Sequence, residues 1–361
     1  MSVFFPENGS ADPEDGIGHE PGTKDEPPAP GTSRRSRRAR WVVALLAVLV
    51  GVVVVSVVAA TSYVATVSHS VSENLQRGED LPPDVPTAAG EAPRPVKPAE
   101  AAKAVNYVLM DSDSLTGDAG QGRSDVLMVL HLSGDRRSAA LISFPRDLYV
   151  SIPGHGKNKI NAAYAFGGPQ LTVRTLEGLL GTRMDHTALI DFDGFISLTD
   201  TLGGVTVNNP HASASHGYSF PTGRITVSGA EALAYVRERK QLPNGDLDRA
   251  ERQRLVARAI LAKGLSQKTL TNPVAFNKFA GGLAKQVTVD PGLSMGELRR
   301  TALSIRFTPS DIDSMQAPIK GFDTSPTHQS IDVVDKSAMA DLAEALRDDR
   351  LADYRAEHPE G

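Results

Sequence analysis

The residues best suited to chemistry lie between positions 237 and 254, a stretch rich in arginines and acids around a Pro-Asn-Gly turn. A guanidinium group holds a phosphate through paired hydrogen bonds, so several converging arginines would bind a pyrophosphate. The arginines in question are Arg237, Arg239 and Arg249. Taken alone, such a charge run more often forms a solvated, salt-bridged helix surface. The other motifs of the chain decide between these two interpretations.

The local pattern around these arginines predicts two helices joined by a turn. Residues 228–231 match a capping box, which starts a short helix ending near Val236. A second helix begins near Asp248, with Asp246 or Asp248 as its N-cap. The start of this second helix therefore favours an anion, because helix N-termini carry unpaired N–H groups.

Two further spacings place polar side chains together. Arg249 and Gln253 are one helical turn apart and share a face of the second helix. Arg237 and Arg239 fall on one side of the chain if the segment that carries them is extended. Together they predict a polar site at the start of a helix whose later turns enter the core.

A pair of carboxylates, Asp113 and Asp125, flanks a glycine-rich loop at 117–122 between two predicted strands. A loop that closes back on itself would bring both carboxylates to one hard cation, Mg²⁺ or Mn²⁺. The competing interpretation is that these are turn-forming aspartates.

Two more polar clusters follow along the chain. Arg146 lies just after a predicted strand, where α/β sites gather, and is a candidate phosphate ligand or the partner of Asp147 in a salt bridge. The stretch 157–168 carries lysines and asparagines and reads on its own as a loop that leads into a helix.

The chain of 361 residues divides into four segments by composition. Residues 1–40 are predicted to be a disordered, acidic cytoplasmic tail with an arginine-rich end. The uncharged run that follows has about 20 apolar residues, enough to cross a bilayer, so 41–67 are predicted as a single-pass signal-anchor helix. Residues 68–103 are predicted to be a Pro-rich extracellular stalk, and 104–361 an extracellular folded domain.

The outer domain alternates short apolar runs with longer mixed segments, which predicts an α/β fold with a central sheet flanked by helices. The expected strands are 105–110, 126–132, 139–144, 187–190 and 205–207. The expected helices are 170–180, 192–202, 247–265, 273–284, 295–305 and 336–347.

Several classes of function lack their motifs. The chain has no cysteine, which excludes disulfides, thiolate metal sites and a cysteine nucleophile. P-loop, dinucleotide-binding and nucleophile-elbow patterns are absent, and the histidines show no zinc spacing, so His211 is expected to be a loop residue. Basic residues without a stacking aromatic motif argue against nucleic-acid binding.

Five ordered motifs together resemble the LytR-CpsA-Psr (LCP) family of membrane-anchored cell-wall glycopolymer transferases. The motifs occupy residues 111–125, 143–147, 159–168, 200–207 and 229–254. This resemblance implies an LCP-type fold and a phosphotransferase that takes a glycopolymer from a polyprenyl-pyrophosphate carrier and joins it to peptidoglycan through a phosphodiester. It also implies an apolar tunnel for the polyprenyl tail.

The resemblance assigns a role to each matched residue. Asp113 and Asp125 would be the Mg²⁺ ligands, while Asp246 and Gln253 would be supporting polar groups. The expected pyrophosphate ligands are Arg123, Arg146, Arg237, Arg239 and Arg249. The general base is left open between Asp113 and Asp246.

The first motif departs from the family pattern, because Asp111 and Leu115 replace a glycine and an arginine. Two alternative functions also fit the sequence. One is a polyprenyl-pyrophosphate pyrophosphatase that uses water as its nucleophile, and the other is a non-catalytic wall-binding or regulatory anchor.

Overall fold

A computed structural model describes residues 69, 71–86, 92–112 and 124–358. The predicted cytoplasmic tail and signal-anchor helix, residues 1–67, lie outside this part of the chain. Among the helices of the described part, none combines the length and the apolar character that a membrane crossing needs.

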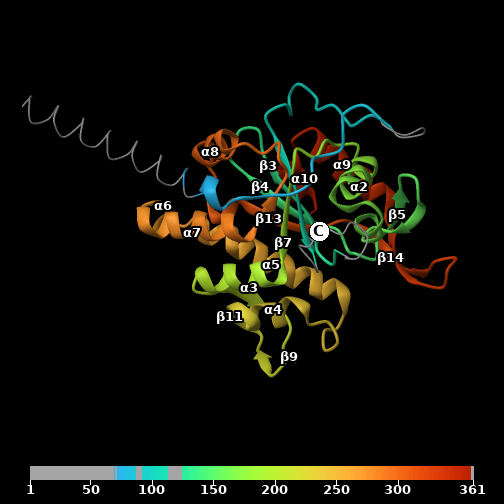
Figure 1. Cartoon of the computed structure of the whole chain (residues 1–361). Helices are drawn as coiled ribbons and strands as arrows, with labels where there is room; N and C mark the ends of the chain where they lie inside the picture. The colour runs from blue at the N-terminus through green and yellow to red at the C-terminus, as the bar shows by residue number, and fades with distance from the viewer. Residues whose placement is uncertain (1–68, 70, 87–91, 113–123, 359–361) are drawn as a thin grey trace, which may run out of the picture. The chain divides into compact units, whose positions relative to one another are not determined.

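The core is a mixed seven-stranded sheet (Figure 1). Its strands, in spatial order, are β1 (Gln76–Arg77), β12 (Thr288–Val289), β7 (His186–Asp191), β2 (Val105–Ser112), β3 (Leu127–Leu132), β4 (Ala139–Ser143) and β13 (Ile312–Gln316). β2 is parallel to β7 and antiparallel to β3, β3 is antiparallel to β4, and β4 is parallel to β13. The carboxyl ends of β2, β4, β7 and β13 therefore meet at one edge of the sheet.

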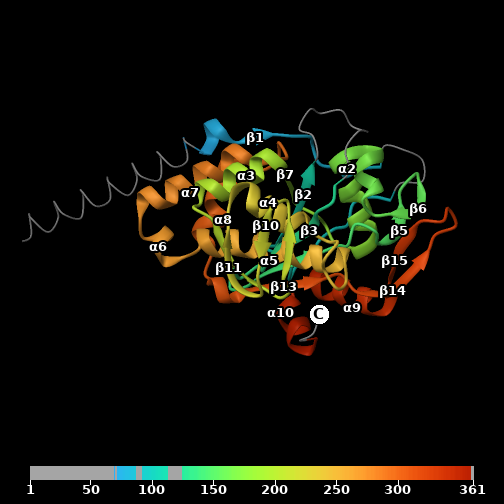
Figure 2. The same ribbon diagram turned by 90° about the horizontal axis from the view of Figure 1, so that it is seen from below.

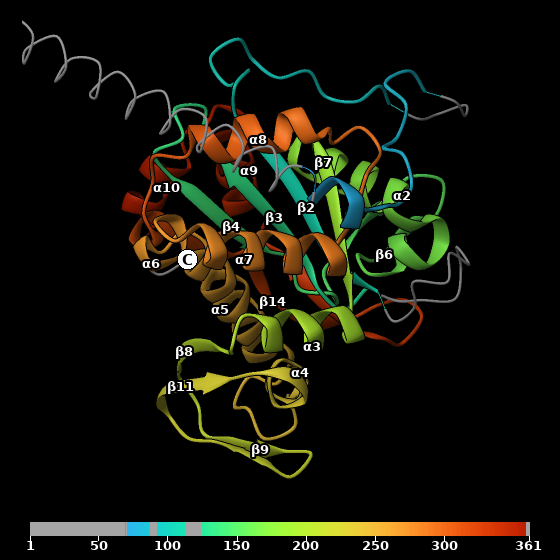
Figure 3. The ribbon, with the colours of Figure 1, turned by 60° about the vertical axis from the view of Figure 1, so that its left-hand side comes forward.

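Helices cover both faces of the sheet, as Figure 3 shows. One face packs against α2 (Ala162–Leu180), α9 (Lys336–Arg347) and α10 (Leu351–Glu357). The other packs against α5 (Asp246–Gly264) and α8 (Met295–Ser304), with α7 (Pro273–Gln286) beside α5. Alternation along β2 explains this arrangement, because Val108 and Met110 belong to the first core and Tyr107 and Leu109 to the second.

Two smaller assemblies extend from the sheet. Below it in Figure 1 lies a lobe with a core of its own, built from α3 (Phe192–Thr201), β8 (Val205–Asn209), β9 (Ser213–Ser215), β10 (Tyr218–Phe220), β11 (Gly223–Val227) and α4 (Gly229–Arg237). In Figure 2 the hairpin of β5 (Tyr149–Ile152) and β6 (Gly156–Lys159) lies beside that of β14 (Ile319–Thr324) and β15 (Ser330–Val334). Two short elements, α6 (Gln267–Leu270) and the 3₁₀ helix η1 (Pro309–Asp311), complete the described chain.

The predicted strands and helices of the outer domain all form, within a few residues of their expected bounds, except that α2 begins earlier, at Ala162. Gly167 and Gly168 have non-helical backbone angles and divide α2 into two pieces just before Pro169. This break explains why only the second piece had a helical pattern that was visible in the sequence.

Of the two predicted helix N-caps, one position is confirmed and the other is wrong. Ser228 is the N-cap of α4 as expected, but its side chain makes no capping hydrogen bond. The N-cap of α5 is Gly245, with φ of 55°, and not Asp246 or Asp248. Asp248 is instead buried inside the first turn, where its carboxylate accepts hydrogen bonds from the backbone and side-chain nitrogens of Asn244.

The predicted stalk is not free-standing in its described residues. β1 joins the edge of the sheet through β12. Arg94 is buried and forms an ion pair with Glu177 of α2 at 2.8 Å, and Lys97 pairs with Asp185 at 2.6 Å. The proline-rich composition masked these contacts, because prolines pack on a surface without contributing a helical or strand periodicity.

Candidate active site

Four charged side chains, named here the Arg–Asp cluster, interlock at the carboxyl edge of the sheet. Arg146 donates a hydrogen bond to Asp125 at 2.8 Å, and its Nη2 lies 3.2 Å from Asp246 Oδ1. Arg249 faces the same two acids, with its Nη1 3.4 Å from Asp125 and its Nη2 3.0 Å from Asp246 Oδ1. Two guanidinium groups thus share two carboxylates. Asp147, the salt-bridge partner that the sequence suggested for Arg146, lies further away, with its Oδ2 3.8 Å from Arg146 Nε.

Three elements bring the Arg–Asp cluster together. Arg146 follows the carboxyl end of β4, and Asp125 precedes β3, which starts at that same edge. Asp246 is the first residue of α5 and Arg249 lies one turn later. The sheet edge and the start of one helix therefore position all four side chains, as expected for a site in an α/β fold.

Several polar atoms of the Arg–Asp cluster lack hydrogen-bond partners. Burial opposes the charge of Arg146, but its bond to Asp125 and the nearby carboxylates of Asp246 and Asp147 raise its pKa. Burial lowers the pKa of Arg249 despite Asp246. Among the described residues, the Nε atoms of both arginines and Asp246 Oδ1 are buried without a hydrogen-bond partner. Unpartnered N–H donors on two adjacent guanidinium groups are what an incoming anion would satisfy.

The other described residues of the predicted site either contact the Arg–Asp cluster or pack near α4 and α5. Arg239 Nη1 lies 3.6 Å from Asp246 Oδ1, while its side chain is 49% exposed. Arg237, the last residue of α4, places its guanidinium 4.4 Å from the centre of the Phe192 ring. Gln253 donates to the carbonyl of Val236 at 3.3 Å, which ties α5 to the end of α4. The structure thus joins Arg239 to the Arg–Asp cluster and places Arg237 against the Phe192 ring.

The predicted metal pair is described only in part. Asp113 and Arg123 lie outside the described residues, as does Leu115. Asp125 is described, and its side chain is 35% exposed, the largest share of any acid in the Arg–Asp cluster.

The departure at position 111 has a structural role. One carboxylate oxygen of Asp111 accepts hydrogen bonds from Ser124 Oγ at 3.1 Å and from the backbone N–H of Val126 at 2.7 Å. Burial, partly offset by these bonds, raises the pKa of Asp111 to about 6. Asp111 therefore joins the two ends of the loop between β2 and β3.

A cavity of about 430 Å³ opens beside the Arg–Asp cluster. Its wall is mostly polar and includes Arg146, Arg239, Lys159, Asn158, Asn161 and Gln329. Lys159 forms a 2.7 Å ion pair with Asp147, so the hairpin β5–β6 is fixed to the residue that follows Arg146. The stretch read on its own as a loop thus supplies part of the wall.

Asp332 is a residue that the sequence did not reveal. It lies on β15 with 5% of its surface exposed, and its backbone N–H donates to the carbonyl of Asp147 at 2.9 Å. Burial, followed by the charges of Asp147 and Asp246, raises its pKa to about 6. No motif marks this position, because its place near the site comes from a hairpin almost two hundred residues away from Arg146 in the chain.

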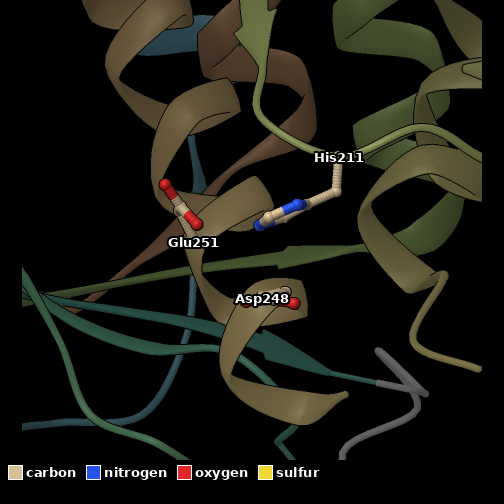
Figure 4. Close-up of side chains that lie close together, drawn as sticks. All are labelled: His211, Asp248 and Glu251. Atoms are coloured by element: carbon tan, nitrogen blue, oxygen red, sulfur yellow. The ribbon is translucent and has the colours of Figure 1, made fainter. Parts of the chain in front are cut away.

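A second polar cluster lies between α5 and the loop that follows β8. Figure 4 shows the imidazole of His211 directed between Asp248 and Glu251. Their ligand atoms lie within 4.8 Å of one another, a proximity that sequence spacing did not predict. Both oxygens of Asp248 already accept hydrogen bonds from Asn244, and Arg252 donates to the carbonyl of His211 at 2.7 Å. These contacts connect the loop after β8 to α5.

The model of the LytR_cpsA_psr family matches residues 61–348. The chain belongs to this family. The resemblance inferred from the five motifs is confirmed, and the match includes the segment first interpreted as a stalk.

Curated LytR_cpsA_psr relatives carry the name polyisoprenyl-teichoic acid–peptidoglycan teichoic acid transferase TagU. TagU of Bacillus subtilis is 41% identical over 167 residues, which cover 46% of this chain and 54% of that protein. TagU of Oceanobacillus iheyensis is 34% identical over 251 residues, covering 66% of this chain and 75% of that protein. The chain spans about half the length of the Bacillus subtilis and Bacillus licheniformis proteins, 54% in each case.

Solved structures of LytR_cpsA_psr proteins share the fold. The crystal structure of B. subtilis TagV has a TM-score of 0.59 at 28% identity and covers 69% of this chain and 97% of TagV. A structure of TagT bound to LI-WTA has a TM-score of 0.55 at 26% identity, covering 73% of this chain and 98% of TagT. The predicted LCP-type α/β fold, a central sheet with flanking helices, is confirmed.

Proposed function

We propose that this protein is a membrane-anchored phosphotransferase that joins a glycopolymer from a polyprenyl-pyrophosphate carrier to cell-wall peptidoglycan. The observation that carries the proposal is the Arg–Asp cluster with its unpartnered guanidinium N–H groups, in a chain of the LytR_cpsA_psr family. The TagU relatives are named as transferases of teichoic acid to peptidoglycan, which agrees with this substrate class.

The Arg–Asp cluster suits a pyrophosphate. Arg146 and Arg249 present buried donors, and the exposed Arg239 can close over a ligand from the solvent side. A diphosphate would exchange the shared carboxylate contacts for charge-assisted bonds to its own oxygens. We also propose Arg123 and Arg237 as pyrophosphate ligands, because they match the motifs of the family. Arg237 would reach the ligand from its position against the Phe192 ring.

The residues present also fit a magnesium ion. Asp125 offers carboxylate oxygens to solvent. Asp246 Oδ1 pairs with Arg146 at 3.2 Å and Arg249 at 3.0 Å but accepts no aligned hydrogen bond among the described residues. We propose that Asp125 holds Mg²⁺ together with Asp113. Oxygen-only ligands of this kind select Mg²⁺ or Mn²⁺. The ion would neutralise charge that develops on the phosphate oxygens.

The protein has an apolar surface suited to the polyprenyl tail of the substrate and a polar cavity suited to its sugars. Apolar side chains on the α5 face of the sheet, including Leu109, Leu130 and Ala188 on central strands, remain partly exposed although helices cover this face. We assign the polyprenyl tail to this surface, which also includes Leu261 of α5. The polar cavity beside Arg146 suits the sugars of the glycopolymer.

The reaction breaks one bond and forms another. An acceptor hydroxyl of peptidoglycan attacks the phosphorus that carries the glycopolymer, and the bridging P–O bond breaks. The polyprenyl phosphate leaves with the electron pair, and the hydroxyl proton passes to a carboxylate such as Asp246. Arg146 and Arg249 stabilise the negative charge on the leaving group.

The test supplies the full-length protein in detergent with a lipid-linked glycopolymer, with and without peptidoglycan fragments. If the protein is a transferase, mass spectrometry is expected to detect a phosphodiester-linked product only when the peptidoglycan fragments are present. Release of free polymer phosphate without a linked product would instead establish the pyrophosphatase. A non-catalytic anchor would consume neither the lipid-linked glycopolymer nor the peptidoglycan fragments. In that case the double variant Arg146→Ala, Arg249→Ala would also keep full cellular function.

The anchor itself is part of the proposal. Residues 41–67 would cross the membrane once, with the arginine flank in the cytoplasm and the catalytic domain outside. Protease added to wall-free cells is expected to digest the domain and to spare the tail. A protected domain would exclude a wall polymer as its substrate.

A further inference from the structure

Arg254 interrupts an apolar stripe of α5. Ala250 precedes it by one turn, and Ala257 and Leu261 follow on the same side, where they pack toward the sheet. A charged side chain at this position is unusual, because the stripe otherwise closes the second core.

The guanidinium of Arg254 has a neutral partner in the structure. Its Nη1 donates to the hydroxyl of Ser143, the buried last residue of β4, at 2.7 Å. Among the described residues, none of the carboxylates forms an ion pair with it. Burial lowers its pKa to about 10, and the charge of Glu251 partly offsets this effect. A partly buried guanidinium that makes no ion pair can take a bound anion as its counter-charge, so Arg254 suits an anion that binds during function.

Arg258, one turn further along α5, provides the contrast. Its Nε donates to the carbonyl of Ile312 at 2.8 Å, and its Nη2 to the carbonyl of Pro309 at 3.3 Å. These two bonds fasten α5 to the start of β13 and the turn before it. Arg258 therefore bonds to two backbone carbonyls, whereas Arg254 Nη1 bonds to a side-chain hydroxyl.

The order of side chains along α5 indicates which anion Arg254 meets. Asp246 and Arg249 belong to the Arg–Asp cluster at the start of the helix, and Leu261 belongs to the partly exposed apolar surface further on. Arg254 lies between them, about 7.5 Å along the axis from Arg249. Ser143 is the last residue of β4, three residues before Arg146, so the pair lies at the sheet edge that carries the cluster.

We propose that Arg254 and Ser143 bind the phosphate that stays on the lipid carrier, the leaving group of the transfer. This inference rests on the proposed function and adds a residue pair to it. When the bridging P–O bond breaks, its electron pair remains on the polyprenyl phosphate. Arg254 then holds that added negative charge, and the Ser143 hydroxyl donates a second hydrogen bond to the same phosphate.

The experiment compares Arg254→Met with the matched variant Arg258→Met in the full-length protein in detergent. The probes are farnesyl monophosphate, which mimics the leaving group, and inorganic pyrophosphate, each titrated while the melting temperature is followed. Arg254→Met is expected to keep or raise the melting temperature of the empty protein and to weaken farnesyl monophosphate binding at least tenfold. Arg258→Met is expected to lower the melting temperature and to leave that binding unchanged.

A structural role for Arg254 would give the opposite pattern. A lower melting temperature of Arg254→Met with unchanged farnesyl monophosphate binding would overturn the proposal. If Arg254→Met does not fold, Ser143→Ala takes its place, with an expected severalfold loss of farnesyl monophosphate binding, and unchanged binding overturns the proposal. The two proposals can be told apart. If the wild type shows no transfer but farnesyl monophosphate binding still depends on Arg254, the lipid phosphate site is supported and the proposed transfer is contradicted.

Discussion

Arg239 is the guanidinium next to the Arg–Asp cluster that contributes least to the fold, because half of its side chain is exposed and its ion pair with Asp246 is long, at 3.6 Å. We expect Arg239→Ala to lower kcat/KM for transfer by about 100-fold, the loss typical of one removed donor to a developing anion. Its free energy of unfolding should change little, since exposed ion pairs stabilise weakly. Steady-state transfer kinetics and urea unfolding measure the two effects.

The matched control for this variant is Lys240→Ala, which removes an exposed neighbouring charge. Arg239→Lys should recover little activity, because an ammonium group lacks the paired donors of a guanidinium. Normal turnover of Arg239→Ala would show that the site centre is elsewhere.

Asp332 predicts a pH dependence of stability. Its pKa is about 6 in the folded protein, above the ordinary 3.8. A raised carboxyl pKa contributes stability that is fully present below pH 4 and is lost as the pH rises through 6. Asp332→Asn, which carries no charge at any pH, should therefore be more stable than the wild type by roughly 2 kcal/mol at pH 7.5 and about equal to it at pH 4.

Urea unfolding of both proteins at several pH values isolates this effect, because every other titrating group is common to the two. The groups that face Asp332 are Asp147, Asp246, Lys159 and Arg146. A stability difference that stays constant between pH 4 and 7.5 would contradict a raised pKa.

The roles of individual arginines could not be predicted from the sequence. The arginines of the 237–254 stretch look alike in the sequence, yet they separate into different roles. Arg252 is fully buried and stacks on Tyr235 at 4.4 Å, while Arg249 joins the Arg–Asp cluster. Helical spacing predicts which side chains share a face, but what that face meets depends on strands distant in the sequence.

At the scale of elements, the start of α4 depends on one glycine. Gly229 has a φ of 52°, and a Cβ there would lie 2.6 Å from a carboxylate oxygen of Asp200. We expect Gly229→Ala to be less stable by more than the about 1–3 kcal/mol of backbone strain alone, because the clash adds to it. Thermal unfolding measures the loss.

The comparison for this glycine is Gly217 in the β9–β10 turn, with a φ of 84° and no atom within 4 Å of an added Cβ. Gly217→Ala should show the backbone cost without the clash. Equal losses for the two variants would mean that Asp200 moves freely away. Because α4 leads into Arg239, the larger loss should be accompanied by lower transfer activity.

The elements differ in how readily the sequence reveals them. Strands β2, β3 and β4 were predicted from their apolar runs, since both faces of the sheet are covered. The hairpin β5–β6 was missed because β6 reads Gly-Lys-Asn-Lys, a polar strand that pairs only with its neighbour. The site was predicted as far as its motifs extended, and Asp332 and Arg254 required the tertiary structure.

At the scale of the whole molecule, the domain begins earlier than its composition indicates. β1 extends the sheet, and the segment around Arg94 packs on α2. A chain that starts at residue 104 is therefore expected to melt at a lower temperature than one that starts at 69. Composition identified this segment as Pro-rich, but burial of individual side chains within it is a property of the fold.

The ion pair of Arg94 and Glu177 provides the sharpest test of this boundary. Their side chains are 2% and 3% exposed, and Arg94 also donates to the carbonyl of Met184. Arg94→Met would leave Glu177 charged and buried without its partner, so we expect a loss of about 3–5 kcal/mol in the free energy of unfolding. The double variant Arg94→Met, Glu177→Gln should recover much of this loss, because the amide oxygen of glutamine can still accept the 2.9 Å hydrogen bond from the backbone N–H of Met184 without a buried charge. If Arg94→Met unfolds at the same urea concentration as the wild type, the segment before residue 104 does not belong to the folded domain in solution.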